Sequence, residues 1–224
     1  MDINASDIYS FYQTKLGGIV KRIIRQKIMS YLDEVDTNII CGYGYTSPYL
    51  SFINKHNASS QVKELRPDFL DGAVQEKYDF EEKAIHEYFI PLEPSTVDVV
   101  ISSHLLEFVE KPISSIEEIW RILKPNGYFI TILPRRSGLW SRYDNNPFGY
   151  GRSYSSKQFQ KLIEDFFVLD NKKSFLHFPP WEHYLNYKTY KTIENIGNNI
   201  FPYMGGLMIC CLLYTSDAAD EVRR

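Results

Sequence analysis

The sequence predicts a doubly wound α/β fold built around a mostly parallel sheet. Short apolar runs alternate along the chain with segments whose apolar residues recur at steps of three and four, which is typical of βαβ units. Residues 97–102 are apolar on both faces, as in a buried parallel strand. The chain has 224 residues, of which 44% are hydrophobic, enough for one domain with a sizeable core.

Composition narrows the possible classes of protein. A formal net charge of -3 gives no general attraction to nucleic acid or to an anionic membrane. The three cysteines, Cys41, Cys210 and Cys211, form no zinc or disulfide pattern and suit a reducing compartment. No apolar run approaches the roughly 20 residues that span a bilayer, and the polar start at 2–7 is unlike a signal peptide. We therefore expect a cytoplasmic protein without a membrane span or a metal.

The expected elements follow in a regular order. Residues 7–32 predict one long helix. After it we expect strands at 38–41, 60–66, 86–92, 97–102, 128–133, 167–170 and 205–210, and helices from 47, over 114–123 and near 155–166, with a turn at 124–127. The polar face of the first helix carries five cations that could meet RNA or lipid, although a solvated face is the commoner explanation: Lys15, Lys21, Arg22, Arg25 and Lys27.

A glycine turn, Gly42-Tyr43-Gly44, lies between the first strand and the next helix. Ligands bind doubly wound sheets outside the carboxyl ends of the strands. Glycine lets the backbone approach a ligand, and a helix N-terminus attracts an anionic group. Glycines also occur there for tight geometry alone. The motif lacks the third glycine of a dinucleotide fingerprint, which favours a non-phosphorylated nucleoside cofactor over NAD.

Residues 97–133 resemble the class I S-adenosylmethionine (SAM)-dependent methyltransferases, in particular the type 11 domains. The matching segments are the strand at 97–101, Ser102-Ser-His104-Leu-Leu-Glu107-Phe108 at its end, and Ile119-Trp-Arg-Ile-Leu-Lys-Pro-Asn-Gly127. Ile90-Pro91-Leu92 resembles the segment that lies beside the adenine in that family. The resemblance covers about residues 35–170. It implies a Rossmann-like sheet with an antiparallel final strand, and SAM as the cofactor.

A narrower resemblance is to a bacterial subgroup, typical of alphaproteobacteria, whose substrates are unassigned. It rests on the segments Tyr45-Thr-Ser-Pro-Tyr-Leu50, Ser103-His104-Leu-Leu-Glu107-Phe108, Leu133-Pro-Arg-Arg-Ser-Gly-Leu-Trp140, Pro147-Phe-Gly-Tyr-Gly-Arg152-Ser-Tyr-Ser155 and Phe178-Pro-Pro180.

The resemblance assigns a set of cofactor-binding residues. Residues 38–41 stand where the family has an acidic residue before the glycines, and Glu64, with Asp68 behind it, is the nearest candidate for the ribose hydroxyls. The expected contacts to SAM are Cys41, Gly42, Tyr43, Gly44, Glu64, Pro91, Leu92, Ser103 and His104.

Two regions are candidates for the acceptor chemistry. His104 could act as a general base, or it could simply line the cofactor pocket, and Glu107 could bind substrate or stabilise a helix start. The loop 134–155 combines arginines with aromatic residues, which can hold a planar or anionic group or form an apolar lid. Its proposed substrate contacts are Arg135, Arg136, Trp140, Tyr150 and Arg152.

The end of the sequence, 211–224, resembles a translated sequencing adapter, and we expect it to be non-native, with a short natural polar tail as the alternative. Residues 1–210 would then form one methyltransferase-like domain that is truncated within its last strand. A strand cut short there leaves ladder groups unpaired and would lower stability.

The leading hypothesis is a SAM-dependent methyltransferase with a small-molecule acceptor. An inactive methyltransferase-like binding or scaffold domain is the alternative, motivated by the missing acidic positions. RNA methylation is a weaker alternative hypothesis that rests on the basic face of the first helix. Nucleic acid is therefore not the partner that we expect.

Overall fold

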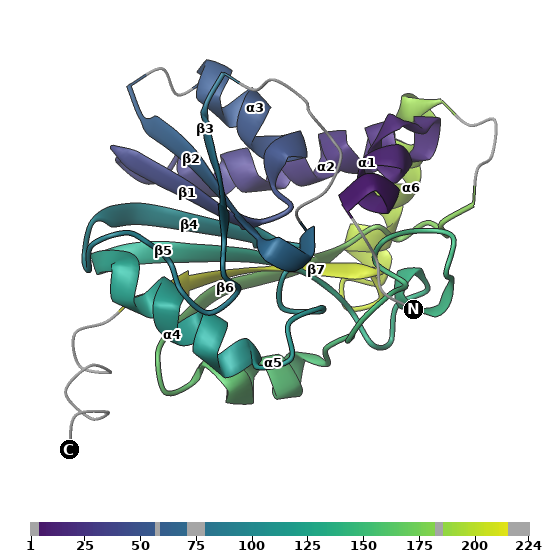
Figure 1. Ribbon diagram of the computed structural model, residues 1–224. Helices are drawn as coiled ribbons and strands as arrows, with labels where there is room; N and C mark the ends of the chain where they lie inside the picture. The colour runs from purple at the N-terminus through teal and green to yellow at the C-terminus, as the bar shows by residue number, and fades with distance from the viewer. Residues whose placement is uncertain (1–4, 57–58, 71–78, 182–185, 215–224) are drawn as a thin grey trace.

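The protein is described by a computed structural model that covers residues 5–56, 59–70, 79–181 and 186–214. Its centre is a seven-stranded sheet with the order β3-β2-β1-β4-β5-β7-β6 (Figure 1). All neighbours pair in parallel except β7, which is antiparallel to both β5 and β6. The predicted doubly wound sheet with an antiparallel final strand is confirmed. The strands are β1 (Ile39–Gly44), β2 (Gln61–Pro67), β3 (Glu81–Ile85), β4 (Val97–Ser103), β5 (Leu123–Pro134), β6 (Val168–Phe175) and β7 (Leu207–Leu213).

Helices cover both faces of the sheet (Figure 1). One face carries α1 (Ala5–Gln13), α2 (Lys15–Leu32), α3 (Ser47–His56) and α6 (Tyr187–Ile200), and the other carries α4 (Pro112–Ile122) and α5 (Ser156–Ile163). Short 3-10 turns, η1 (Asp68–Leu70) and η2 (Trp140–Arg142), follow β2 and β5. None of the helices in the described part of the chain combines the length and the apolar character that crossing a bilayer requires.

Each face has its own apolar core. In β4, Val99 and Ile101 pack in the core under α1, α2 and α3, whereas Val100 packs in the core under α4 and α5. Successive side chains of a strand point to opposite faces, so a central strand must be apolar throughout, as the sequence at 97–102 predicted.

The prediction of a single helix over 7–32 is wrong because the chain breaks at Thr14. This residue is extended, and its hydroxyl accepts a hydrogen bond from the Gly17 amide at 2.9 Å, which caps α2. A Cβ at Gly17 would lie 1.9 Å from the Phe11 carbonyl oxygen, so glycine is needed where the two helices meet. The break turns α1 over the carboxyl edge of the sheet.

Other boundaries also differ from the prediction. The strand expected at 86–92 is wrong: β3 is the more polar segment 81–85, and carbonyls of the apolar run are instead bound by Arg121. The turn expected at 124–127 lies inside β5, where Asn126 has a positive φ of 63° next to a register shift. Helix α6 was not predicted, although Asn186 caps it through a bond from the Thr189 amide.

The last strand does not stop at 210. Residues 211–213 continue β7 and pair with β5 on one side and β6 on the other. These residues are apolar and extend the same ladder. The described strand thus runs to Leu213, and the loss of stability expected from a truncated natural strand stays a prediction. Residues 215–224 lie outside the described residues, and the non-native origin of 211–224 stays a prediction.

We predict opposite effects of alanine at two glycines. Gly44 has a φ of +105°, and a Cβ there would lie 2.4 Å from the Ser103 carbonyl oxygen. Gly44→Ala should therefore lower the free energy of unfolding by at least about 2 kcal/mol through strain and clash. Gly18 in α2 has open space around its Cβ position, and Gly18→Ala should raise stability by about 0.5–1 kcal/mol. Urea denaturation measures both, and equal stabilities would contradict the described backbone at Gly44.

Candidate functional site

The carboxyl ends of β1 and β4 meet in a pair of tight turns. The Tyr45 amide donates to the Ser103 carbonyl at 3.0 Å, and the positive φ of Gly44 makes this approach possible. At Gly42, a Cβ would lie 2.1 Å from the Thr46 hydroxyl, so this glycine lets the start of α3 pack back on β1. Both predicted glycines are thus required by the geometry of the turn, which brings the first turn of α3 beside the end of β4.

Glu64 holds this turn together. Its Oε1 accepts bonds from the Thr46 and Ser47 amides at 2.7 and 2.6 Å and from the Thr46 hydroxyl at 2.9 Å. Its Oε2 accepts bonds from the Ser47 hydroxyl at 2.5 Å and from Arg66 at 2.8 Å. Arg66 also pairs with Glu82. Both oxygens of the predicted ribose contact are therefore used within the protein.

The other predicted cofactor residues are spread around this edge. Cys41 and Tyr43 lie in the core under α4 and α5, and the Tyr43 hydroxyl donates to the Glu87 carbonyl. The segment with Pro91 and Leu92 is fixed to α4, because Arg121 donates to the Leu92 carbonyl at 2.8 Å. The structure brings Gly44, Ser103 and His104 together, since the turns after β1 and β4 touch.

His104 sits in a strained and buried position at the end of β4. Its φ is +53°, a left-handed conformation that is uncommon outside glycine. Its side chain is 0% exposed, and its ring lies 4.7 Å from the Phe148 ring, measured between centroids. Its Nε2 lies 2.9 Å from the hydroxyl of Tyr12 in α1, which in turn contacts the Tyr49 hydroxyl of α3. Sequence reasoning missed Tyr12 and Tyr49, because the break at Thr14 was not foreseen.

Glu107 is buried beside His104. The two side chains are 0% exposed, and Oε1 of Glu107 lies 3.6 Å from Nδ1 of His104. Among the described residues, neither carboxyl oxygen nor Nδ1 has a hydrogen-bond partner. Burial raises the pKa of Glu107 to about 8 and lowers the pKa of His104 to about 3. Both groups are therefore held mainly in their neutral forms at pH 7.

Buried polar atoms gather where the two turns meet. The turn after β1 approaches the end of β4 through backbone alone, and unpartnered polar atoms of His104 and Glu107 lie beside it. Asp68, at the end of β2, is exposed and forms no hydrogen bond or ion pair with another described residue. Its carboxylate is thus available at the edge, unlike that of Glu64.

The loop 134–155 does not gather its five predicted substrate residues. Trp140 is fully buried and donates to the Phe178 carbonyl at 2.7 Å. Arg135 donates to the Tyr203 carbonyl. Arg136 and Arg152 line one surface hollow, while Tyr150 lines a different one.

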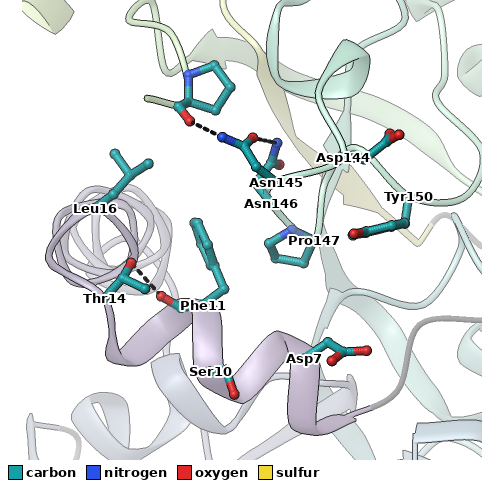
Figure 2. Close-up of a pocket in the computed structure, with 11 residues that line it drawn as sticks. Asp7, Ser10, Phe11, Thr14, Leu16, Asp144, Asn145, Asn146, Pro147 and Tyr150 are labelled. Atoms are coloured by element: carbon teal, nitrogen blue, oxygen red, sulfur yellow. Dashed lines mark hydrogen bonds between the residues drawn. The ribbon is translucent and has the colours of Figure 1, made fainter. Parts of the chain in front are cut away.

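A cavity of about 600 Å³ lies between α1 and this loop, and we name it the α1–loop pocket (Figure 2). In Figure 2, Phe11 projects from α1 into this space and Pro147 and Tyr150 come from the loop side. Phe11 packs edge-on against Phe148, which covers His104. The pocket is thus one aromatic layer away from His104. Its lining is Asp7, Ser10, Phe11, Thr14, Leu16, Asp144, Asn145, Asn146, Pro147, Tyr150 and Pro180.

Residues 38–131 match the family model described as Methyltransferase domain. Two relatives also match part of the chain. The mitochondrial arginine-hydroxylase NDUFAF5 of Homo sapiens is 32% identical over 94 residues, which are 40% of this chain and 26% of that protein. The highly reducing polyketide synthase pkhB of Emericella nidulans is 29% identical over 101 residues, 45% of this chain and 4% of that protein. The chain therefore matches only about a quarter, or less, of the length of these relatives.

Solved structures show the same fold at low identity. A SAM-dependent methyltransferase from Archaeoglobus fulgidus has a TM-score of 0.60 at 12% identity, covering 86% of this chain and 94% of that one. One from Thermotoga maritima has a TM-score of 0.56 at 14% identity, covering 88% and 99%. The [4+2]-cyclase SpnF also matches, with a TM-score of 0.54 at 12% identity over 81% of this chain and 77% of that one. The chain has the fold of SAM-dependent methyltransferases, and its match to the methyltransferase domain implies S-adenosylmethionine as the cofactor.

Proposed function

We propose that this chain is a SAM-dependent methyltransferase that acts on a small-molecule acceptor. The observation that carries the proposal is the joined pair of turns after β1 and β4, which lies inside the residues that match the methyltransferase domain. The carboxyl ends of parallel strands are where doubly wound folds bind ligands. The buried, strained His104 at this point is typical of a functional position rather than a packing one.

We assign the cofactor contacts to the main chain of 42–46, to Ser103 and His104, and to Asp68. The sulfonium of SAM supplies an electrophilic methyl group, so the protein's task is to position the acceptor and receive its proton. Asp68 replaces Glu64 in this proposal because the Glu64 carboxylate is already saturated by α3 and Arg66. An exposed carboxylate at the end of β2 can accept hydrogen bonds from ribose hydroxyls.

We place the acceptor in the α1–loop pocket. Its volume of about 600 Å³ lies within the range of roughly 300–1,000 Å³ that is usual for small-molecule sites. Phe11, in the wall of the pocket, packs against Phe148, which packs against His104. The proposal requires these rings to move so that the acceptor reaches the imidazole. Within the loop 134–155, Tyr150 is then the substrate contact that the geometry favours.

The contacts made by the basic face of α2 favour a small-molecule acceptor over RNA. Three of its cations contact other groups of the protein: Arg25 donates to the Pro48 carbonyl at 2.6 Å, Arg22 stacks over Tyr187, and Lys27 lies over Phe175. The inactive-domain alternative is favoured by the saturation of Glu64.

We predict that the full chain binds SAM in isothermal titration calorimetry. Asp68→Asn should weaken binding about tenfold, or about 1.4 kcal/mol, because the amide loses a charge-assisted hydrogen bond. Asp36→Asn is the matched control, since this exposed carboxylate precedes β1 at the opposite edge of the sheet. Its affinity should equal that of the wild type. Binding that needs about 1 mM SAM is already far weaker than the affinity of a working cofactor site. Absence of binding at about 1 mM SAM would therefore rule out the proposed function.

We also predict that bulk tRNA gives no salt-sensitive gel shift with this chain. Binding to phosphate backbones requires free lysines and arginines, and its affinity falls steeply with added salt. A shift at low micromolar protein that disappears between 50 and 200 mM salt would instead support RNA as the acceptor.

A further inference from the structure

Four buried polar side chains form a chain from α3 to the turn after β4. The Tyr49 hydroxyl contacts the Tyr12 hydroxyl, which lies 2.9 Å from Nε2 of His104. On the other side of the ring, Nδ1 lies 3.6 Å from Oε1 of Glu107. The imidazole therefore bridges a hydroxyl on one side and a carboxyl on the other, which is the arrangement that positions histidine as a base in hydrolases.

No side-chain hydrogen bond accounts for the burial of Glu107. The backbone amides of its own turn, at 104, 105 and 107, act to lower the pKa of the carboxyl, but burial outweighs them. The Glu107 side chain is fully buried, and neither oxygen has a hydrogen-bond partner among the described residues. A buried polar group without a partner lowers stability, so such groups are rare unless they serve a function. The only ion-pair contact that the described residues give Glu107 is His104.

Within the described ranges, the other titratable groups that face Glu107 are phenols. They are Tyr12 of α1, Tyr49 of α3 and Tyr154 before α5, and burial raises the pKa of each above the usual tyrosine value. Because the pKa of Glu107 is about 8 and lies below all of these, Glu107 is the first of the group to lose its proton as pH rises. His104 stays neutral throughout, since burial lowers its pKa to about 3.

The charge of Glu107 then selects the tautomer of His104. A neutral Glu107 donates its O–H toward Nδ1, so the ring proton lies on Nε2 and points to the Tyr12 oxygen. An ionised Glu107 attracts the ring proton to Nδ1, so Nε2 becomes an acceptor and faces the Tyr12 hydroxyl. Only in the second state does an unprotonated, basic Nε2 face the side on which the methyl acceptor would bind.

We propose that Glu107 is the terminal proton acceptor of the methyl-transfer reaction and that His104 relays the proton to it. This inference rests on the proposed function. In this scheme the Tyr12 hydroxyl occupies the position that an acceptor O–H or N–H takes at Nε2. A proton moves from the acceptor atom to Nε2 while the Nδ1 proton moves to the Glu107 carboxylate.

Atoms and charges balance in this step. The acceptor atom gains a methyl group and loses a proton, the bond between sulfur and methyl breaks, and its electron pair stays on sulfur as a neutral thioether. The carboxylate becomes a neutral acid, so one positive and one negative charge disappear together. The separation of 3.6 Å between Nδ1 and Oε1 must shorten for transfer, as catalytic hydrogen bonds do when ligands bind.

The test is the tautomer of His104 as a function of pH in the full chain without cofactor. Long-range 1H–15N correlation spectra distinguish protonated from unprotonated ring nitrogens, and comparison with His104→Asn identifies the resonances. The wild type should carry the ring proton on Nε2 at pH 6 and on Nδ1 at pH 10, with a midpoint about pH 8. Glu107→Gln should hold one tautomer over this range, because the amide does not titrate.

Glu110→Gln is the matched control, because this exposed carboxylate lies three residues away in the same turn and should keep the wild-type transition. A single His104 tautomer from pH 6 to 10 in the wild type would overturn the proposal. So would an imidazolium at pH 6, or a transition that persists in Glu107→Gln. The wild-type titration decides the question even if Glu107→Gln does not fold. Calorimetry with SAM tests the proposed function separately, because this titration uses no cofactor.

Discussion

The close approach of Gly44 to the Ser103 carbonyl is the constraint on which the site depends. It joins the turns after β1 and β4, so that the start of α3 and the ring of His104 share one edge of the sheet. A side chain at 44 would separate them, and a second constraint, the cap that Glu64 forms on α3, holds the turn from the other side. The edge is thus shaped by backbone contacts before any ligand arrives.

The break at Thr14 couples this edge to the rest of the chain. Because α1 leaves the line of α2, Tyr12 reaches His104 while Phe11, its neighbour, lines the α1–loop pocket. The same short helix therefore covers the proposed base and forms a wall of the proposed acceptor site. Displacement of Tyr12 by an acceptor would link substrate entry to the exposure of Nε2.

Much of the fold follows from periodicity, since strands buried on both faces and amphipathic helices leave strong patterns, as at 97–102 and in α4. Sequence patterns also predicted that Gly44 and His104 end neighbouring strands, and the structure brings the two turns into contact. They did not reveal the partners of Glu64 or the break at Thr14, because both depend on contacts between distant elements. The strand at 81–85 was missed because an exposed edge strand carries charges that hide its alternation. Trp140 was predicted to contact the substrate, yet tertiary packing buries it fully, and its ring N–H donates to the Phe178 carbonyl.

We expect a bound cofactor to contact the paired turns and not the basic face of α2. Hydrogen–deuterium exchange with and without S-adenosylhomocysteine, the product of methyl donation, tests this most directly. The amides of 42–47 and 103–107 should gain protection on binding, while those of α2 from Lys21 onward should not change. Protection confined to other parts of the chain, or none at saturating ligand, would contradict the assignment of this edge as the cofactor site.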